Sequence, residues 1–229
     1  MGKSSWGSVP IVSRKGFRDG ARLGSIFNFI DHLSALNEIF RIGPDLKIEI
    51  FTSIPNEDLL SKAVAVHVRR GDTQAKGSLW NQPGRDDQFG LIDYALKCKL
   101  AGEQMGLKDL FVITDSDDTV EQLALLLPDF DVHQSTFDKS RFFRQPLGKS
   151  VNVEEHVREN PQLADFYVSS TIGDLLAVSR CAGFVGPLAT SEMSRTAYYL
   201  QIAKHQQFTP CFEVGGALSI HDPNFASLI

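Results

Sequence analysis

The sequence predicts an α/β fold, a Rossmann-like parallel sheet with helices on both faces. Short apolar runs rich in β-branched residues alternate along the chain with longer stretches whose apolar residues recur at helical spacing. Several of these runs end abruptly in polar residues, as parallel strands do at the sheet edge where ligands bind. No internal repeat is found in the chain.

The first sixty residues are predicted to lie outside this sheet. Residues 1–20 are rich in Gly, Ser and basic residues, which is typical of a loop or a frayed terminus. Apolar residues at the spacing of one helix face follow over 20–40. We therefore expect a helical segment, or the remnant of a first domain, over 1–60, and the α/β domain over 61–229.

Five strands and four connecting helices are expected in the α/β domain. The strands are predicted at 63–68, 110–114, 130–133, 182–186 and 208–214. The helices are predicted at 89–104, 120–127, 162–180 and 190–204. In the first of these helices the apolar face is expected to consist of Ile92, Ala95, Leu96 and Leu100.

Composition excludes several classes of function. The net charge of −5 provides no overall basic field for nucleic acid or an anionic membrane, so any anion site must be local. No stretch approaches the roughly 18 uninterrupted apolar residues of a membrane span. We expect no nucleic-acid partner and no membrane segment in this chain. The three cysteines lack metal-ligand spacing and are expected to be reduced, small apolar side chains: Cys98, Cys181 and Cys211.

Charge is concentrated directly after the strand at 63–68. This strand delivers His67, Arg69, Arg70 and Asp72 to its C-terminal end. Adjacent arginines at such an edge need an anionic partner, and their forked donors match the oxygens of a diphosphate. Pairing of the arginines with carboxylates of the chain is the alternative explanation. The position after a buried strand favours the diphosphate.

Two further strand ends are predicted to bring polar groups to the same edge. Asp115 follows the strand at 110–114, and Thr190 and Ser191 follow the strand at 182–186. In a parallel sheet these ends share one edge, so groups distant in sequence converge there. Thr190 and Ser191 also open a helix, whose N–H groups and dipole favour a phosphate. Capping of that helix would explain the two hydroxyls equally well.

Residues 67–72, which read His-Val-Arg-Arg-Gly-Asp, resemble the His-x-Arg-Arg signature of the α1,6-/O-fucosyltransferase superfamily. Further blocks follow in the order of that family, at 89–94, 111–117, 174–181 and 184–195. In the last block Thr-Ser-Glu-Met-Ser-Arg is similar to the family's Ser-Ser-x-x-x-Arg turn, which contacts phosphate. The resemblance implies the C-terminal, donor-binding half of a GT-B glycosyltransferase.

The resemblance also implies roles for individual residues. Arg69 and Arg70 would hold the diphosphate of GDP-fucose, and Arg69 would act in catalysis. Asp72 is taken as the second catalytic residue, because it could substitute for the base that the family places a few residues later; Asp86 and Asp87 could substitute equally well. The donor site would consist of His67, Arg69, Arg70, Tyr94, Asp115, Asp174, Thr190 and Ser191. Asp174 would accept from N1–H and the exocyclic amine of guanine. From the sequence alone, a hydrogen bond from Ser170 or Arg180 is an equal explanation of this carboxylate.

The implied activity is transfer of fucose from GDP-fucose to a hydroxyl of a glycan or protein acceptor, inverting and metal-independent, with no cofactor beyond the donor substrate. Departures from the family pattern favour an alternative, a GDP-sugar-binding module without transfer activity. Thr73 stands where α1,6-fucosyltransferases have Lys, and Lys76 and Gly77 stand where they place a glutamate proposed as the base. The first GT-B domain would also be reduced to about sixty residues.

Two remaining expectations concern metal and compartment. Asp115-Ser116-Asp117 spells the Asp-x-Asp pattern with which another glycosyltransferase class holds Mn²⁺ on a nucleotide sugar. A metal would leave Arg69 and Arg70 without a clear function, so no metal is expected. A full-length chain is expected in the cytoplasm, whereas a fragment of a eukaryotic family member would come from the lumen of the secretory pathway.

Overall fold

The computed structural model describes residues 50–69, 89–115, 118–138, 157–188 and 191–215. Several residues of the sequence hypotheses lie outside this part of the chain: Arg70, Asp72, Thr73, Lys76, Gly77, Ser116, Asp117 and Thr190. The helix expected over 20–40 also lies outside it. Among the helices that are described, none is long and apolar enough to cross a bilayer.

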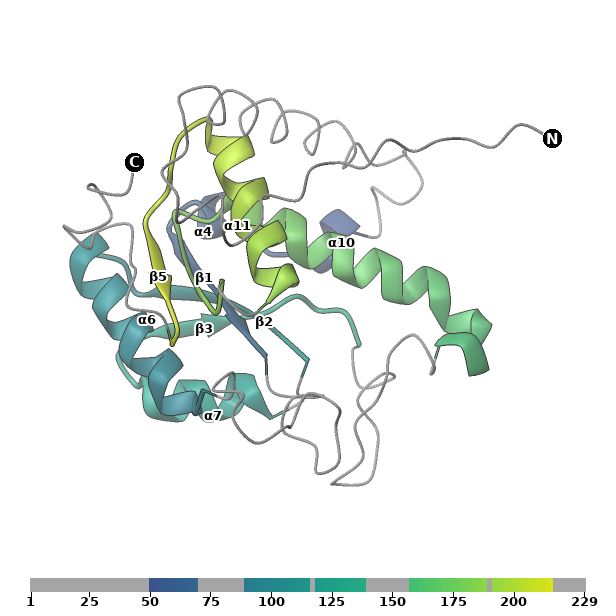
Figure 1. Ribbon diagram of the computed structural model, residues 1–229, viewed down its shortest axis with the longest axis horizontal. Helices are drawn as coiled ribbons and strands as arrows, with labels where there is room; N and C mark the ends of the chain where they lie inside the picture. The colour runs from purple at the N-terminus through teal and green to yellow at the C-terminus, as the bar shows by residue number, and fades with distance from the viewer. Residues whose placement is uncertain (1–49, 70–88, 116–117, 139–156, 189–190, 216–229) are drawn as a thin grey trace, which may run out of the picture.

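Within the described residues, five strands form one sheet in the order β3-β2-β1-β4-β5 (Figure 1). All pairings between neighbouring strands are parallel, which confirms the predicted α/β class. The strands are β1 (Ala63–Val68), β2 (Asp109–Thr114), β3 (Asp131–His133), β4 (Gly183–Gly186) and β5 (Cys211–Glu213). The bounds of β1 are the predicted ones. The strand β2 begins one residue earlier than predicted, and β3 and β4 begin one residue later; all three end as predicted. The strand β5 begins three residues later than predicted and ends one residue earlier.

Helices cover both faces of the sheet, as predicted (Figure 1). Because successive side chains of a strand point to opposite faces, Val64, Val66 and Val68 belong to one core cluster and Ala63 and Ala65 to another. The valines pack with α6 (Leu91–Met105) and α7 (Thr119–Leu126). The alanines pack with α4 (Glu57–Leu60), α10 (Ala164–Arg180) and α11 (Glu192–His205). The central strand β1 is therefore buried at every residue.

The face of α6 that packs on the sheet is only in part the predicted one. Ala95 is buried as predicted, whereas Ile92 and Leu96 are 64% and 62% exposed and Leu100 is 38% exposed. The other buried residues are Leu91, Tyr94, Cys98, Ala101 and Gly102. The rest of the prediction was wrong because it followed the large aliphatic residues, whereas small residues allow the helix to lie close to its neighbours. A Cβ atom at position 102 would lie only 2.8 Å from the carbonyl oxygen of Leu107.

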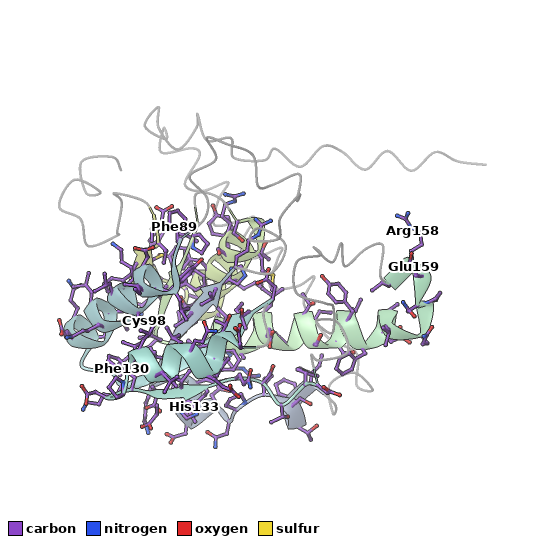
Figure 2. The ribbon with its side chains drawn as sticks, turned by 90° about the horizontal axis from the view of Figure 1, so that it is seen from below. Phe89, Cys98, Phe130, His133, Arg158 and Glu159 are labelled. Atoms are coloured by element: carbon purple, nitrogen blue, oxygen red, sulfur yellow. The ribbon has the colours of Figure 1, made fainter. Side chains whose placement is uncertain are left out.

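The long helix α10 begins away from the sheet and ends against it. Arg158 and Glu159, which precede α10 and the short 3-10 turn η1 (Pro161–Leu163), lie far from the strands (Figure 2). The buried residues of α10 lie in its later turns and include Asp174. The C-terminus of this helix leads into the first residue of β4, at the edge of the sheet where the parallel strands begin.

The cysteines behave as predicted. Cys98, Cys181 and Cys211 are free and buried. Burial raises the pKa of all three thiols far above the usual range, because a thiolate would lose its hydration in the core. The three cysteines therefore serve as small apolar side chains of the core.

Candidate functional site

The strand order reverses between β1 and β4. From β1 the chain moves outward through β2 to β3, and it then returns to the other side of β1 to form β4 and β5. At such a switch point the loops after the two central strands lead in opposite directions, and ligands of open α/β sheets bind there. The residues that follow β1 and β4 are therefore the first place to look for a site.

A hydrogen bond joins the two sides of this switch point. Nδ1 of His67, near the end of β1, lies 2.6 Å from Oγ of Ser194 in the first turn of α11. His67 is 6% exposed and Ser194 is fully buried. Although they are 127 residues apart in sequence, the two side chains fix the end of β1 against the start of the helix that follows β4.

The N-terminus of α11 is held in a defined conformation. Ser191 has extended backbone angles, and its Oγ accepts from the N–H of Ser194, so Ser191 caps the helix. The N–H of Ser191 donates to the carbonyl oxygen of Pro187 at 3.0 Å. Nη1 of Arg195 donates to the carbonyl oxygen of Leu188 at 2.6 Å. These bonds fix the turn between β4 and α11, of which residues 189 and 190 are not described.

Gly186, the last residue of β4, allows α11 to approach the strand closely. A Cβ atom at this position would lie 2.8 Å from the ring of Phe184 and 3.3 Å from Oγ of Ser194. A Cβ atom here would require the ring of Phe184 to shift and would crowd the hydroxyl of Ser194. A glycine therefore suits this position beside the contact between Ser194 and His67.

Arg69 and Asp115 lie side by side at the same edge. The N–H of Arg69 donates to the hydroxyl of Tyr94, a buried residue of α6, across 3.5 Å. The register pairs Val68 with Thr114, so the next residue of each strand, Arg69 and Asp115, occupies neighbouring positions. Tyr94 thus contacts β1 from the face opposite to Ser194, and α6 and α11 together hold the end of this strand.

Asp174 receives its hydrogen bond from a residue that the sequence did not indicate. Its Oδ1 accepts from Oγ of Ser135, which follows β3, at 2.8 Å. Ser170 donates instead to the carbonyl oxygen of Tyr167 within the same helix. The guanidinium of Arg180 lies 3.8 Å from Glu57 and over the ring of Phe51. The alternative donors proposed for Asp174 therefore have other partners, and its role in guanine recognition stays a prediction.

The structure thus brings His67, Arg69, Tyr94, Asp115 and Ser191 to one edge of the sheet. Asp174 lies on α10, in contact with the segment after β3. Sequence reasoning missed Ser194 as a site residue, although its place three residues after the cap is a signal that the sequence carries. Among the described residues, no group of three or more His, Cys, Asp and Glu side chains could hold a metal ion.

The chain is similar in structure to proteins whose crystal structures are known. No protein-family model and no curated protein matches the chain. A crystal structure of POFUT1, an O-fucosyltransferase, in complex with GDP matches with 15% sequence identity and a TM-score of 0.44. The match covers 75% of this chain and 47% of that chain.

A crystal structure of NodZ alpha-1,6-fucosyltransferase soaked with GDP-fucose matches with 18% identity and a TM-score of 0.36. It covers 70% of this chain and 43% of that one. The matches thus cover less than half of the length of these solved structures. Both are fucosyltransferases, the class that residues 67–72 resemble in sequence.

Proposed function

We propose that this chain is a glycosyltransferase that moves fucose from GDP-fucose to a hydroxyl of a glycan or protein acceptor. The observation that carries the proposal is the hydrogen bond between His67 and Ser194. It joins the strand that ends in the His-x-Arg-Arg signature to the N-terminus of α11. Two elements that each favour a bound anion thereby lie together at the switch point of the sheet.

Both elements suit the diphosphate of a nucleotide sugar. The guanidinium of Arg69 offers a planar fork of donors to phosphate oxygens. The first turn of α11 has N–H groups without acceptors inside the helix and carries the positive end of the helix dipole. Ser191 satisfies one of these N–H groups, that of Ser194, and leaves the others to acceptors outside the helix.

The same groups would assist the transfer. In an inverting displacement the acceptor oxygen forms a bond to C1 of fucose while the bond from C1 to the diphosphate oxygen breaks. The electron pair of that bond leaves with GDP, so negative charge grows on the diphosphate. In this proposal the diphosphate lies next to Arg69 and the N-terminus of α11. Groups that bind growing charge lower the barrier. Asp72, three residues after Arg69, is the proposed acceptor of the hydroxyl proton, and the reaction needs no metal.

Calorimetric titration with GDP, GDP-fucose and UDP tests the donor site. We expect GDP and GDP-fucose to bind and UDP to bind at least about tenfold more weakly, since guanine presents donors that uracil lacks in that arrangement. Arg69→Ala should weaken GDP binding by about ten- to a hundredfold, the scale of a charged hydrogen bond. Arg158→Ala is the matched control, because it removes the same charge at an exposed position far from the strands (Figure 2). A folded Arg69→Ala protein that binds GDP like the wild type contradicts the assignment.

A GDP-sugar-binding module without transfer activity is the second candidate. Lys76 and Gly77, at the place of the family's glutamate, favour it. Incubation of the chain with GDP-fucose and a panel of glycan and peptide acceptors separates the candidates. Release of GDP together with fucosylated product, unaffected by a chelator, supports metal-independent transfer. Tight GDP-fucose binding with neither GDP release nor product supports the binding module.

A further inference from the structure

Helix α6 carries a line of apolar side chains on its exposed side. Ile92, Leu96 and Leu100 follow one another at intervals of four residues and are 64%, 62% and 38% exposed. Residues four apart lie one above the other on the same helix face. Single exposed apolar residues are common on protein surfaces, whereas three in line are typical of a helix face that packs against another element. These three residues, the apolar stripe, are therefore a candidate docking surface.

Charged residues border the apolar stripe on both flanks. Because successive residues of an α-helix are about 100° apart, Asp93 and Lys97 lie on one flank and Lys99 lies on the other. The carboxylate of Asp93 accepts from the backbone N–H of Gly90 at 2.8 Å. A carboxylate has several acceptor positions, so this bond leaves Asp93 able to pair with a cation as well.

The spacing of the apolar stripe suits an antiparallel helix of the same sequence. With a rise of about 1.5 Å per residue, side chains four residues apart are separated by about 6 Å along the helix axis, which leaves room for one side chain of the other helix between them. Two antiparallel registers make the apolar side chains of the two copies alternate evenly. In one the two-fold axis is level with position 95 of both copies, and in the other it is level with position 97.

The charges on the first flank distinguish these two registers. In an antiparallel pair, residues of the same flank meet when they lie equally far from the two-fold axis on either side of it. With the axis level with position 97, Lys97 would meet the partner's Lys97, and like charges would lie together. With the axis level with position 95, Asp93 meets the partner's Lys97, and Lys97 meets the partner's Asp93. Charge complementarity therefore favours the register centred on position 95 and indicates a second copy of this chain as the occupant.

We propose that two copies of this chain associate through the apolar stripe of α6, antiparallel and with the two-fold axis beside Ala95. The interface is isologous, so each copy supplies the same stripe and the same two charges. A single helix pair is a small interface, so we expect a dissociation constant in the micromolar range. The apolar stripe contains no residue of the candidate site, so this inference stands apart from the proposed function.

Sedimentation equilibrium of the full chain over a concentration series measures the association. Ile92→Asp and Leu96→Asp place a charge in the apolar stripe of both copies, and each should weaken the dimer at least about thirtyfold, the effect of losing a central anchor of an interface. An acidic residue suits the first turn of a helix, so Ile92→Asp should leave α6 folded. Val168→Asp is the matched control, because Val168 is an exposed apolar residue of α10, which packs on the other face of the sheet.

Charge reversal tests the register. Lys97→Glu and Asp93→Lys each bring like charges together, so each variant alone should form dimers about tenfold more weakly than the wild type. An equimolar mixture of the two variants should associate about as tightly as the wild type, because opposite charges then meet on both sides of the axis. Asp93→Lys also loses the bond from Gly90, but this loss is the same alone and in the mixture. Lys99→Glu reverses a charge on the other flank and should have little effect.

Three results would overturn the proposal. The first is a wild type that remains a monomer even at about 1 mM. The second is a dimer that Ile92→Asp and Leu96→Asp leave intact, or that Val168→Asp disrupts equally, because the contact then does not depend on the apolar stripe. The third is a dimer that forms as well from Lys97→Glu or from Asp93→Lys alone as from the wild type, because this refutes the register centred on position 95.

Discussion

Replacement of Gln201 by leucine should remove one of the main polar connections that hold α11 in place. Nε2 of this buried residue lies 3.3, 2.7 and 3.1 Å from the carbonyl oxygens of Val178, Cys181 and Gly183. Its Oε1 accepts from Oγ1 of Thr209 at 2.7 Å. One side chain thus connects α11 with the end of α10, the start of β4 and the segment before β5. Its loss should loosen the helix that carries Ser191 and Ser194.

The cost in stability follows from which groups lose their partners. Leucine has a similar volume, so the core stays filled. The carbonyl oxygen of Val178 keeps the N–H of Cys181, and the carbonyl oxygen of Cys181 keeps Nε2 of His205. The carbonyl oxygen of Gly183 belongs to a strand residue that is paired with β1, so the hydroxyl of Thr209 is the group that loses its acceptor. One buried group of this kind costs about 1–3 kcal/mol, a sizeable part of the total stability of a typical domain.

Urea unfolding followed by circular dichroism measures this cost directly. We expect a lower midpoint with an unchanged slope. Thr209→Val is the partner in a double-mutant cycle, because it removes the hydroxyl that Gln201→Leu leaves without an acceptor. The double variant should be more stable than the sum of the single effects by at least about 1 kcal/mol. A Gln201→Leu protein within about 0.5 kcal/mol of the wild type would refute the reasoning, since surface substitutions without structural roles have effects of that size.

Further predictions concern the thiols, Thr119 and Gly102. Because the raised pKa keeps the buried thiols neutral only in the folded state, stability should fall above about pH 9, by up to about 1.4 kcal/mol per pH unit for each thiol. Urea unfolding at pH 8 and pH 10 checks this, and the loss should shrink when alanine replaces Cys98, Cys181 and Cys211. Thr119→Val should stabilise by about 1 kcal/mol in thermal melts, because Oγ1 of Thr119 is buried and has no hydrogen-bond partner among the described residues. A lower melting temperature would contradict it. Gly102→Ala should destabilise by about 1–3 kcal/mol in urea despite the better helix propensity of alanine, and exposed Glu103→Ala should be nearly neutral.

The central strand could be predicted to the residue because its sequence is unambiguous. Residues 63–68 contain no charged side chain, and the charged residue Arg69 follows directly. The change from apolar to charged residues therefore marks the end of the strand. The parallel sheet followed from the alternation of such runs with helices. The packed face of α6 could not be predicted in this way. Its buried residues include Ala101 and Gly102, which give no strong apolar signal, and a Cβ atom on Gly102 would meet the ring of Phe130 and the carbonyl oxygen of Leu107.

The contacts of the candidate site were harder to predict than its location. The sequence indicated that His67 ends a strand and that Ser191 opens a helix at the same edge. It did not indicate that Ser194 meets His67, because this depends on how closely α11 approaches Gly186. The donor of Asp174 was sought among neighbours within its own helix, whereas Ser135 lies 39 residues earlier in the chain and is brought in by the segment after β3.

The His-x-Arg-Arg signature lies at the end of β1, and contacts from both faces of the sheet fix the backbone there. Alternate side chains of a strand face opposite sides, and the two last contacts of β1 come from opposite layers. Ser194 on α11 meets the side chain of His67, and Tyr94 on α6 meets the N–H of Arg69. The backbone from which Arg69 extends is therefore fixed from both faces before any ligand arrives. A ligand that binds there does not have to order this backbone, so binding costs less conformational entropy. A larger part of the free energy of its contacts with Arg69 therefore contributes to the affinity.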